Sequence, residues 1–138
     1  MAGTGVTSAD AADADPGHGR DADATGVAAR DTLENILGNA TNGLALHAPT
    51  PEALTRARRN LVNFRREHPE TPAVLVVNGA AATHALDAPD PATDAALVLC
   101  GNSLAAAGRT APPGARTTPA AVALLHTLQQ RGWSYFRA

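Results

Sequence analysis

The single cysteine of this 138-residue chain lies where a thiol can do chemistry. Cys100 follows the apolar run 95–99, which predicts a buried strand, and it precedes Gly101, which ends that strand. Asn102 and Ser103 are residue types that cap a short helix. Such a turn places the sulfur at the carboxyl edge of a strand and beside a helix start, where peptide N–H groups and the helix dipole stabilise an anion. The sequence therefore predicts that Cys100 can be held as a thiolate.

Two interpretations of this thiol remain open on the sequence alone. A free cysteine at the end of a strand is often a small buried hydrophobic residue with no reaction of its own. A sulfur that carries out chemistry must instead be partly exposed and must be stabilised as an anion. One cysteine excludes an internal disulfide cycle, but it permits the transfer of sulfur to and from a second molecule.

Polar residues also follow the predicted strand 73–77, at the same edge of the sheet. Asn78 and Gly79 form the turn after that strand, and His84 comes shortly behind them. We predict that these three residues line a binding site together with Gly101, Asn102 and Ser103 next to the thiol. His47, at the end of the first predicted strand, is a further candidate for the same pocket.

Several common kinds of site have no signal in the sequence. The histidines, the carboxylates and the cysteine show no metal-ligand spacing, so no metal is expected. The chain contains no Gly-x-Ser-x-Gly, Gly-x-Gly-x-x-Gly or Walker sequence, which leaves hydrolase chemistry and nucleotide binding without support. We therefore expect no cofactor.

Composition divides the chain into a tail and a domain. Residues 1–30 consist mainly of Ala, Asp, Gly and Thr and contain no aromatic residue, so we predict a disordered acidic tail there. Residues 31–42 are expected to form a linker or a short helix, and 43–138 to form one small domain.

The domain alternates predicted strands and helices. The expected strands are 43–48, 73–77, the run that ends at Cys100, and 133–137, with one short strand within 108–118. Thr50-Pro51 and Thr118-Pro119 each combine a helix cap with a proline suited to the first turn, and shorter helices are expected over 80–86 and 103–107. This alternation predicts an α/β domain of three layers, in which helices cover both faces of a mainly parallel sheet.

Charge and hydropathy limit the partners that we expect. The net charge is −2, and the arginines clustered over 56–66 lack the interleaved aromatic residues of a nucleic-acid surface, so no nucleic acid is expected. No apolar stretch approaches the ~20 residues of a membrane span. The absence of a secretory signal pattern and the single cysteine predict a cytoplasmic protein.

Trp133, Tyr135 and Phe136 are concentrated in the last predicted strand, where they serve either the core or an oligomer contact.

Three segments of the chain resemble the DsrE/DsrF-like family of small sulfur-relay (TusD-like) proteins. Residues 100–104 (Cys-Gly-Asn-Ser-Leu) look like the family's Cys-x-Asn-Thr/Ser-Leu segment after a central strand. Residues 128–137 are similar to its closing leucine-glutamine…glycine-tryptophan-x-tyrosine motif, and the helix Leu54 to Phe64 is similar to the first helix of that fold. The resemblance covers roughly residues 43–138.

The resemblance implies a flavodoxin-like α/β domain that assembles into trimers or hexamers. It implies that Cys100 accepts sulfane sulfur from a donor protein as a persulfide and passes it to an acceptor protein. Many relatives have a histidine where the second strand ends, whereas this chain has Asn78-Gly79, so a helper base is missing there. The alternative is a non-catalytic oligomer of the same fold, with a structural or small-ligand-binding role.

Overall fold

The computed structural model describes residues 37–138, and the tail predicted over 1–30 lies outside these described residues. A parallel sheet of five strands runs through the domain in the order β4-β3-β2-β1-β5. Its strands are β1 (Leu44–Ala48), β2 (Ala73–Val77), β3 (Leu97–Cys100), β4 (Thr117–Thr118) and β5 (Ser134–Arg137). Its helices are α2 (Pro51–Glu67), α3 (Ala80–Asp87), α4 (Gly101–Ala106) and α5 (Ala121–Gln130).

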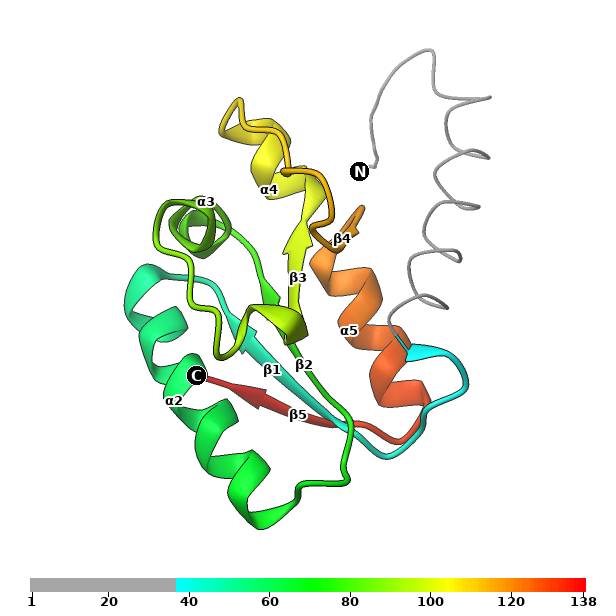
Figure 1. Ribbon diagram of the computed structural model, residues 1–138. Helices are drawn as coiled ribbons and strands as arrows, with labels where there is room; N and C mark the ends of the chain where they lie inside the picture. The colour runs from blue at the N-terminus through cyan, green and yellow to red at the C-terminus, as the bar shows by residue number, and fades with distance from the viewer. Residues whose placement is uncertain (1–36) are drawn as a thin grey trace. The chain divides into compact units, whose positions relative to one another are not determined.

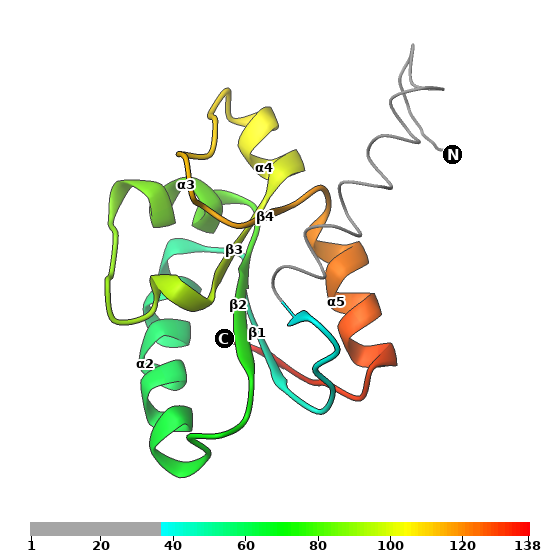
Figure 2. The same ribbon diagram turned by 45° about the vertical axis from the view of Figure 1, so that its right-hand side comes forward.

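Helices cover the sheet on both faces (Figures 1 and 2). On one face, α2, α3 and α4 bury a cluster that includes Leu54, Leu75 and Leu104. On the other face, α5 packs over a second cluster that includes Val98 and Leu128. Alternate residues of β1, β2 and β3 enter one cluster or the other, as the period of two in a strand requires. The predicted three-layer α/β domain with its mainly parallel sheet is thereby confirmed.

The strongest sequence signals are found where they were predicted. Thr50 caps α2, and its hydroxyl oxygen accepts a hydrogen bond from Ala53 N–H at 3.1 Å. Pro51 is the first residue of the helix, and His68, one residue before Pro69, ends it. The strand 73–77 is present at the predicted bounds.

The starts of β3, α4 and α5 each lie two residues from where the sequence predicts them. The strand expected from residue 95 begins at Leu97, since Asp94–Ala96 form a short 3₁₀ turn. The Asp94 carboxylate stabilises the chain just before this turn by accepting a hydrogen bond from Asp90 N–H at 2.9 Å. The other two starts concern the helices on either side of β4.

The helix α4 begins at Gly101 and not at Ser103, and its cap is Cys100, so Asn102 and Ser103 lie inside its first turn. The helix α5 begins at Ala121, with Ala120 as its cap. Thr118, predicted to cap that helix, instead belongs to β4 and pairs with Cys100. The pairing of β4 with β3 therefore decides where α5 starts.

The last strand separates its aromatic residues as the alternation predicted. Trp133 is buried in the α5-face cluster, whereas Phe136 lines a hollow on the opposite face with residues of α2. All four residues of β5 are exposed, and Phe136 is 52% exposed. Within the described part of the segment 31–42, Leu37 packs into the α5-face cluster.

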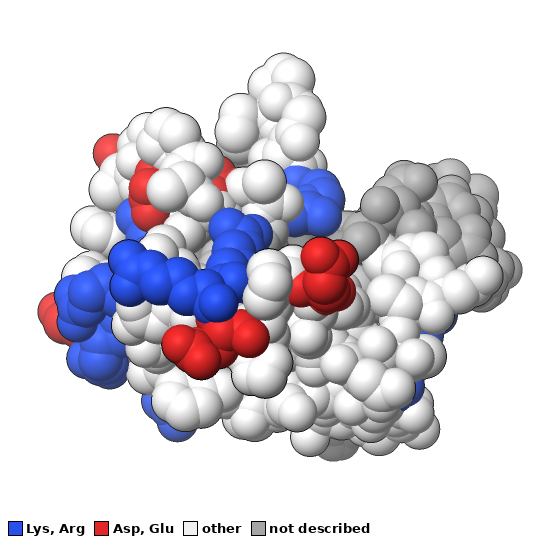
Figure 3. All heavy atoms as spheres, turned by 60° about the horizontal axis from the view of Figure 1, so that its bottom comes forward, with Lys and Arg blue, Asp and Glu red and all other residues white. Residues whose placement is uncertain are grey.

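Acidic side chains lie beside a continuous run of basic ones on this face of the molecule (Figure 3). Arg58 pairs with Asp94 at 3.5 Å and with Asp90 at 3.9 Å. Arg109 pairs with Asp87 at 2.9 Å, and this hydrogen bond is the main cause that lowers the pKa of the Asp87 carboxyl. Arg58 and Arg109 are thus each paired with carboxylates of the same chain. Among residues 37–138, no helix has the length and apolarity needed to cross a membrane.

Candidate functional site

The Cys100 sulfur lies between the starts of two helices. Cys100 is the cap of α4, and its Sγ accepts a hydrogen bond from the N–H of Ala121, the first residue of α5, at 3.4 Å. The cap residue of α5, Ala120, has no side-chain acceptor, so the sulfur accepts from the start of the helix as a serine or aspartate oxygen does elsewhere. The chain passes close by on the other side as well, because a Cβ on Gly101 would lie 3.3 Å from the Thr118 carbonyl oxygen.

Ser103 connects this sulfur to the end of the neighbouring strand. Its Oγ accepts a hydrogen bond from Gly79 N–H at 2.8 Å, which leaves the hydroxyl proton free to donate to Cys100. Gly79 adopts a φ of +56°, a left-handed conformation that favours glycine, and its backbone N–H thereby reaches the α4 side of the turn. The predicted residues Ser103 and Gly79 are therefore joined by a hydrogen bond, and the Ser103 hydroxyl lowers the pKa of the Cys100 thiol.

Burial and hydrogen bonding act on the thiol in opposite directions. Burial raises the pKa of Cys100, because it disfavours the charged thiolate. Hydrogen bonds from the Ser103 hydroxyl and from the N–H groups of Ala121, Ser103 and Asn102 lower that pKa. Together they outweigh burial, so the pKa of Cys100 lies below its ordinary value.

This lowered pKa makes stability depend on pH in a defined direction. Because the thiol pKa is lower in the folded chain, the thiolate contributes stability that is fully present above the unfolded pKa of about 8.5 and is lost as pH falls through the folded pKa. The free energy of unfolding of the wild type, minus that of Cys100→Ala, should therefore increase as pH rises toward about 8.5 and stay constant above that pH. Urea denaturation at a series of pH values measures this difference, and a pH-independent difference contradicts the hydrogen-bonded thiolate.

Asn102, Asn78 and His84 were also predicted to line the site. Asn102 is exposed, and its N–H donates to the Pro119 carbonyl at 3.1 Å. Asn78 follows Val77 as Cys100 follows Leu99, and these two strand residues are paired, so Asn78 and Cys100 are neighbours along the sheet edge. His84 lies in α3, which covers the opposite face of the sheet from the Cys100 cluster. No hydrogen bond joins His84 to Cys100 in the described residues.

A second group of polar side chains joins three strands on the α5 face. The His47 ring bonds the Tyr135 hydroxyl through Nδ1 at 2.6 Å and Asn78 Oδ1 through Nε2 at 2.8 Å. These residues line a groove of about 460 Å³ together with Val122, Leu125, His126 and Gln129 of α5, and we call it the Tyr135 groove. From the sequence, Tyr135 was expected only as a core or interface residue. Its role depends on the β1–β5 register, which pairs His47 with Arg137 and which no local pattern reveals.

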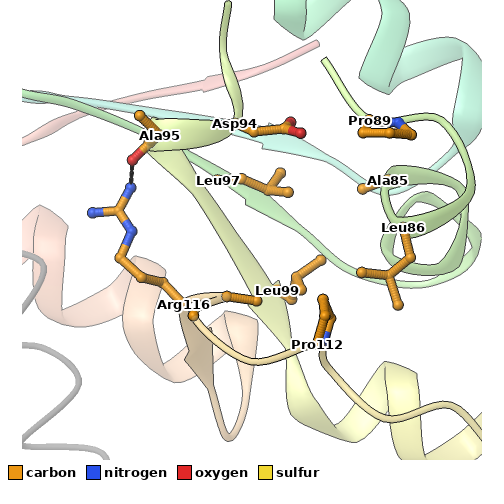
Figure 4. Close-up of a pocket in the computed structure, with 11 residues that line it drawn as sticks. Ala85, Leu86, Pro89, Asp94, Ala95, Leu97, Leu99, Pro112 and Arg116 are labelled. Atoms are coloured by element: carbon orange, nitrogen blue, oxygen red, sulfur yellow. Dashed lines mark hydrogen bonds between the residues drawn. The ribbon is translucent and has the colours of Figure 1, made fainter. Parts of the chain in front are cut away.

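Another cavity, of about 400 Å³, lies on the other side of the molecule between α3, β3 and the chain before β4 (Figure 4). Its walls are mostly apolar, with Leu86, Leu97 and Leu99 among them. The charged groups at its edge are already engaged: Asp94 binds Arg58, and the Arg116 guanidinium donates to the Ala95 carbonyl. Burial lowers the pKa of Arg116. Cys100 is not among the residues that line this cavity.

Residues 37–138 contain no group of three potential metal ligands from His, Cys, Asp or Glu. Cys100 Sγ accepts a hydrogen bond from Ala121 N–H at 3.4 Å, and the neighbouring Ser103 hydroxyl and peptide N–H groups lower the pKa of its thiol. No protein-family model matches the chain, and no curated protein matches it.

Proposed function

We propose that the protein is a sulfur carrier, in which Cys100 accepts sulfane sulfur and passes it on as a persulfide. The observation that carries this proposal is the set of donors that lowers the pKa of the Cys100 thiol despite its burial. The similarity of residues 100–104 and 128–137 to the DsrE/DsrF-like family supports the same function, and we propose membership of that family.

The transfer needs no cofactor and no external oxidant. The Cys100 thiolate attacks the terminal sulfur of a donor persulfide, R–S–SH, and forms a new S–S bond. The donor's own S–S bond breaks, and the donor leaves as a thiolate that takes up a proton. The reverse exchange, with a thiolate of the acceptor protein attacking the terminal sulfur, releases Cys100 unchanged.

Access to the sulfur depends on the start of α5. Cys100 is 5% exposed, so a donor reaches the thiol only when the chain around Ala121 moves away from it. This opening breaks the hydrogen bond from Ala121 N–H to the sulfur and removes Ala121 from the α5-face cluster. Local openings of this kind cost less than global unfolding.

Mass spectrometry of the intact native protein tests the proposal directly. After incubation with inorganic polysulfide, the wild type should gain the mass of one sulfur atom, and dithiothreitol should remove it. Cys100→Ser should gain nothing, since the chain has no other cysteine. A wild type that stays unmodified until it is denatured contradicts the carrier function.

One observation favours a second candidate function, a structural module that binds small ligands. The burial of Cys100 and the hydrogen bond that its sulfur accepts from the first residue of α5 are what a thiol with a purely structural role requires. This candidate is supported if the thiol remains unmodified in the folded protein while a Cys100→Ala variant is less stable.

We also propose that the protein acts as a homo-oligomer in the cytoplasm. The exposed edge strand β5, with Phe136 52% exposed, supplies the kind of aromatic surface that subunit contacts use. Light scattering after size-exclusion chromatography measures the mass, and a Phe136→Ser variant should shift it toward the monomer. A wild type that is monomeric at all concentrations contradicts this proposal.

A further inference from the structure

The Tyr135 groove contains a chain of hydrogen bonds that the sulfur carrier function does not use. Tyr135 binds His47 at 2.6 Å, and His47 binds Asn78 at 2.8 Å, so that three strands or strand ends each contribute one side chain. The His47 ring is half-buried and is held at both nitrogens, whereas Tyr135 is 41% exposed and borders the groove. The outermost group of the chain is therefore the tyrosine hydroxyl.

The ring of His47 determines what this hydroxyl offers to a ligand. Asn78 Oδ1 accepts a hydrogen bond, which places a proton on His47 Nε2. When the ring is neutral, Nδ1 accepts the Tyr135 proton, and only the oxygen lone pairs face the groove. When the ring is protonated, Nδ1 donates to the Tyr135 oxygen, and the O–H turns outward as a donor. Protonation of one half-buried ring thus changes the polarity presented by the groove.

The polar side chains around the groove leave an anion unopposed by negative charge. No Asp or Glu lines it, and its walls carry a second imidazole, His126, and the amide of Gln129. The titratable or charged groups that face His47 are Tyr135 and Arg137 on β5 and His126 on α5, while the end of β2 contributes the neutral Asn78. Leu125 and the 77% exposed Val122 add an apolar wall.

We propose that the Tyr135 groove binds a small organic carboxylate, which accepts a hydrogen bond from the Tyr135 hydroxyl while His47 takes up one proton from solvent. The protonated ring and the carboxylate then form a neutral pair bridged by the tyrosine. The apolar part of the ligand packs on Leu125 and Val122. Asn78 is a positioning residue, since its Oδ1 holds the His47 ring at Nε2.

Calorimetric titration of the full chain with sodium benzoate tests the binding and the proton uptake together. We expect saturable binding at one site that tightens as pH falls, with net uptake of one proton when buffers of different ionisation enthalpy are compared. Tyr135→Phe removes only the hydroxyl and should weaken binding at least about tenfold, the effect of a lost hydrogen bond to a charged group. Benzamide, a neutral molecule of the same shape, should bind without proton uptake.

The controls separate this site from the thiol and from other histidines. Cys100→Ser should bind benzoate as the wild type does, so the result is independent of the sulfur carrier function. His68→Gln, at the end of α2, should change nothing, whereas His47→Gln should abolish the proton uptake. The proposal is overturned by an absence of saturable binding, by unchanged affinity in Tyr135→Phe, or by proton uptake that persists in His47→Gln.

Discussion

Replacing Gly43 with alanine should lower the free energy of unfolding by about 3 kcal/mol, at the upper end of what overpacking a core position costs. A Cβ at this buried position would lie 2.6 Å from the Pro72 carbonyl oxygen and 2.6 Å from Cζ3 of Trp133. The Pro72 carbonyl cannot move away without weakening the hydrogen bond that it accepts from Leu44 N–H at 2.9 Å, where β1 begins to pair with β2. The indole cannot retreat freely either, since it is buried against the sheet.

Chemical denaturation of the two proteins measures this cost, and Gly108→Ala is the matched control. Gly108 has a φ of +69°, and no atom lies within 4 Å of the position that a Cβ would take there. Alanine at this position therefore costs only the strain of its backbone conformation, about 1 kcal/mol. If both variants lose the same free energy of unfolding, the close contact at Gly43 contributes nothing to the cost of Gly43→Ala.

Ser103→Ala should slow the alkylation of Cys100 by iodoacetamide at neutral pH by roughly tenfold, because a hydrogen bond to a charged group is lost. The variant removes the side-chain donor that most lowers the pKa of Cys100. The pKa of the thiol therefore rises, and the whole pH profile of the reaction should move to higher pH. The profile is the decisive measurement, since a changed rate of α5 opening alters the rate at every pH alike.

Ser134→Ala, in the exposed strand β5, is the matched control and should react as the wild type does. Replacing Ser103 also removes the acceptor of Gly79 N–H, but this group is exposed and water replaces the lost partner. An unchanged pH profile in Ser103→Ala means that the hydroxyl does not donate to the sulfur.

Local patterns predicted the elements that local physics determines. The cap and proline at 50–51, the apolar run 73–77 and the alternation over 133–136 each act within a few residues, and each is present as predicted. The predicted start of α5 was wrong because the pairing of Thr118 with Cys100 is a contact between distant residues. The same limit applies to the thiol, whose donor at Ala121 lies 21 residues away along the chain.

The residues around Cys100 and those of the Tyr135 groove also differ in how far the sequence could predict them. Gly101, Asn102 and Ser103 adjoin the cysteine in sequence, so their proximity to it could be predicted. The contact between His47 and Tyr135 spans 88 positions and depends on β5 pairing with β1 and not with β4. A strand order cannot be read from the composition of the strands, and the Tyr135 groove therefore emerged only with the fold.

The indole of Trp133 gives the protein a built-in optical reporter. It is the only tryptophan of the chain, it is buried on the α5 face, and its Nε1–H donates to the Ala40 carbonyl at 3.3 Å. Its fluorescence therefore reports whether residues 37–42 are seated on the sheet. Release of that segment exposes the indole to water and shifts its emission to longer wavelength, so detachment can be followed in real time without any attached dye.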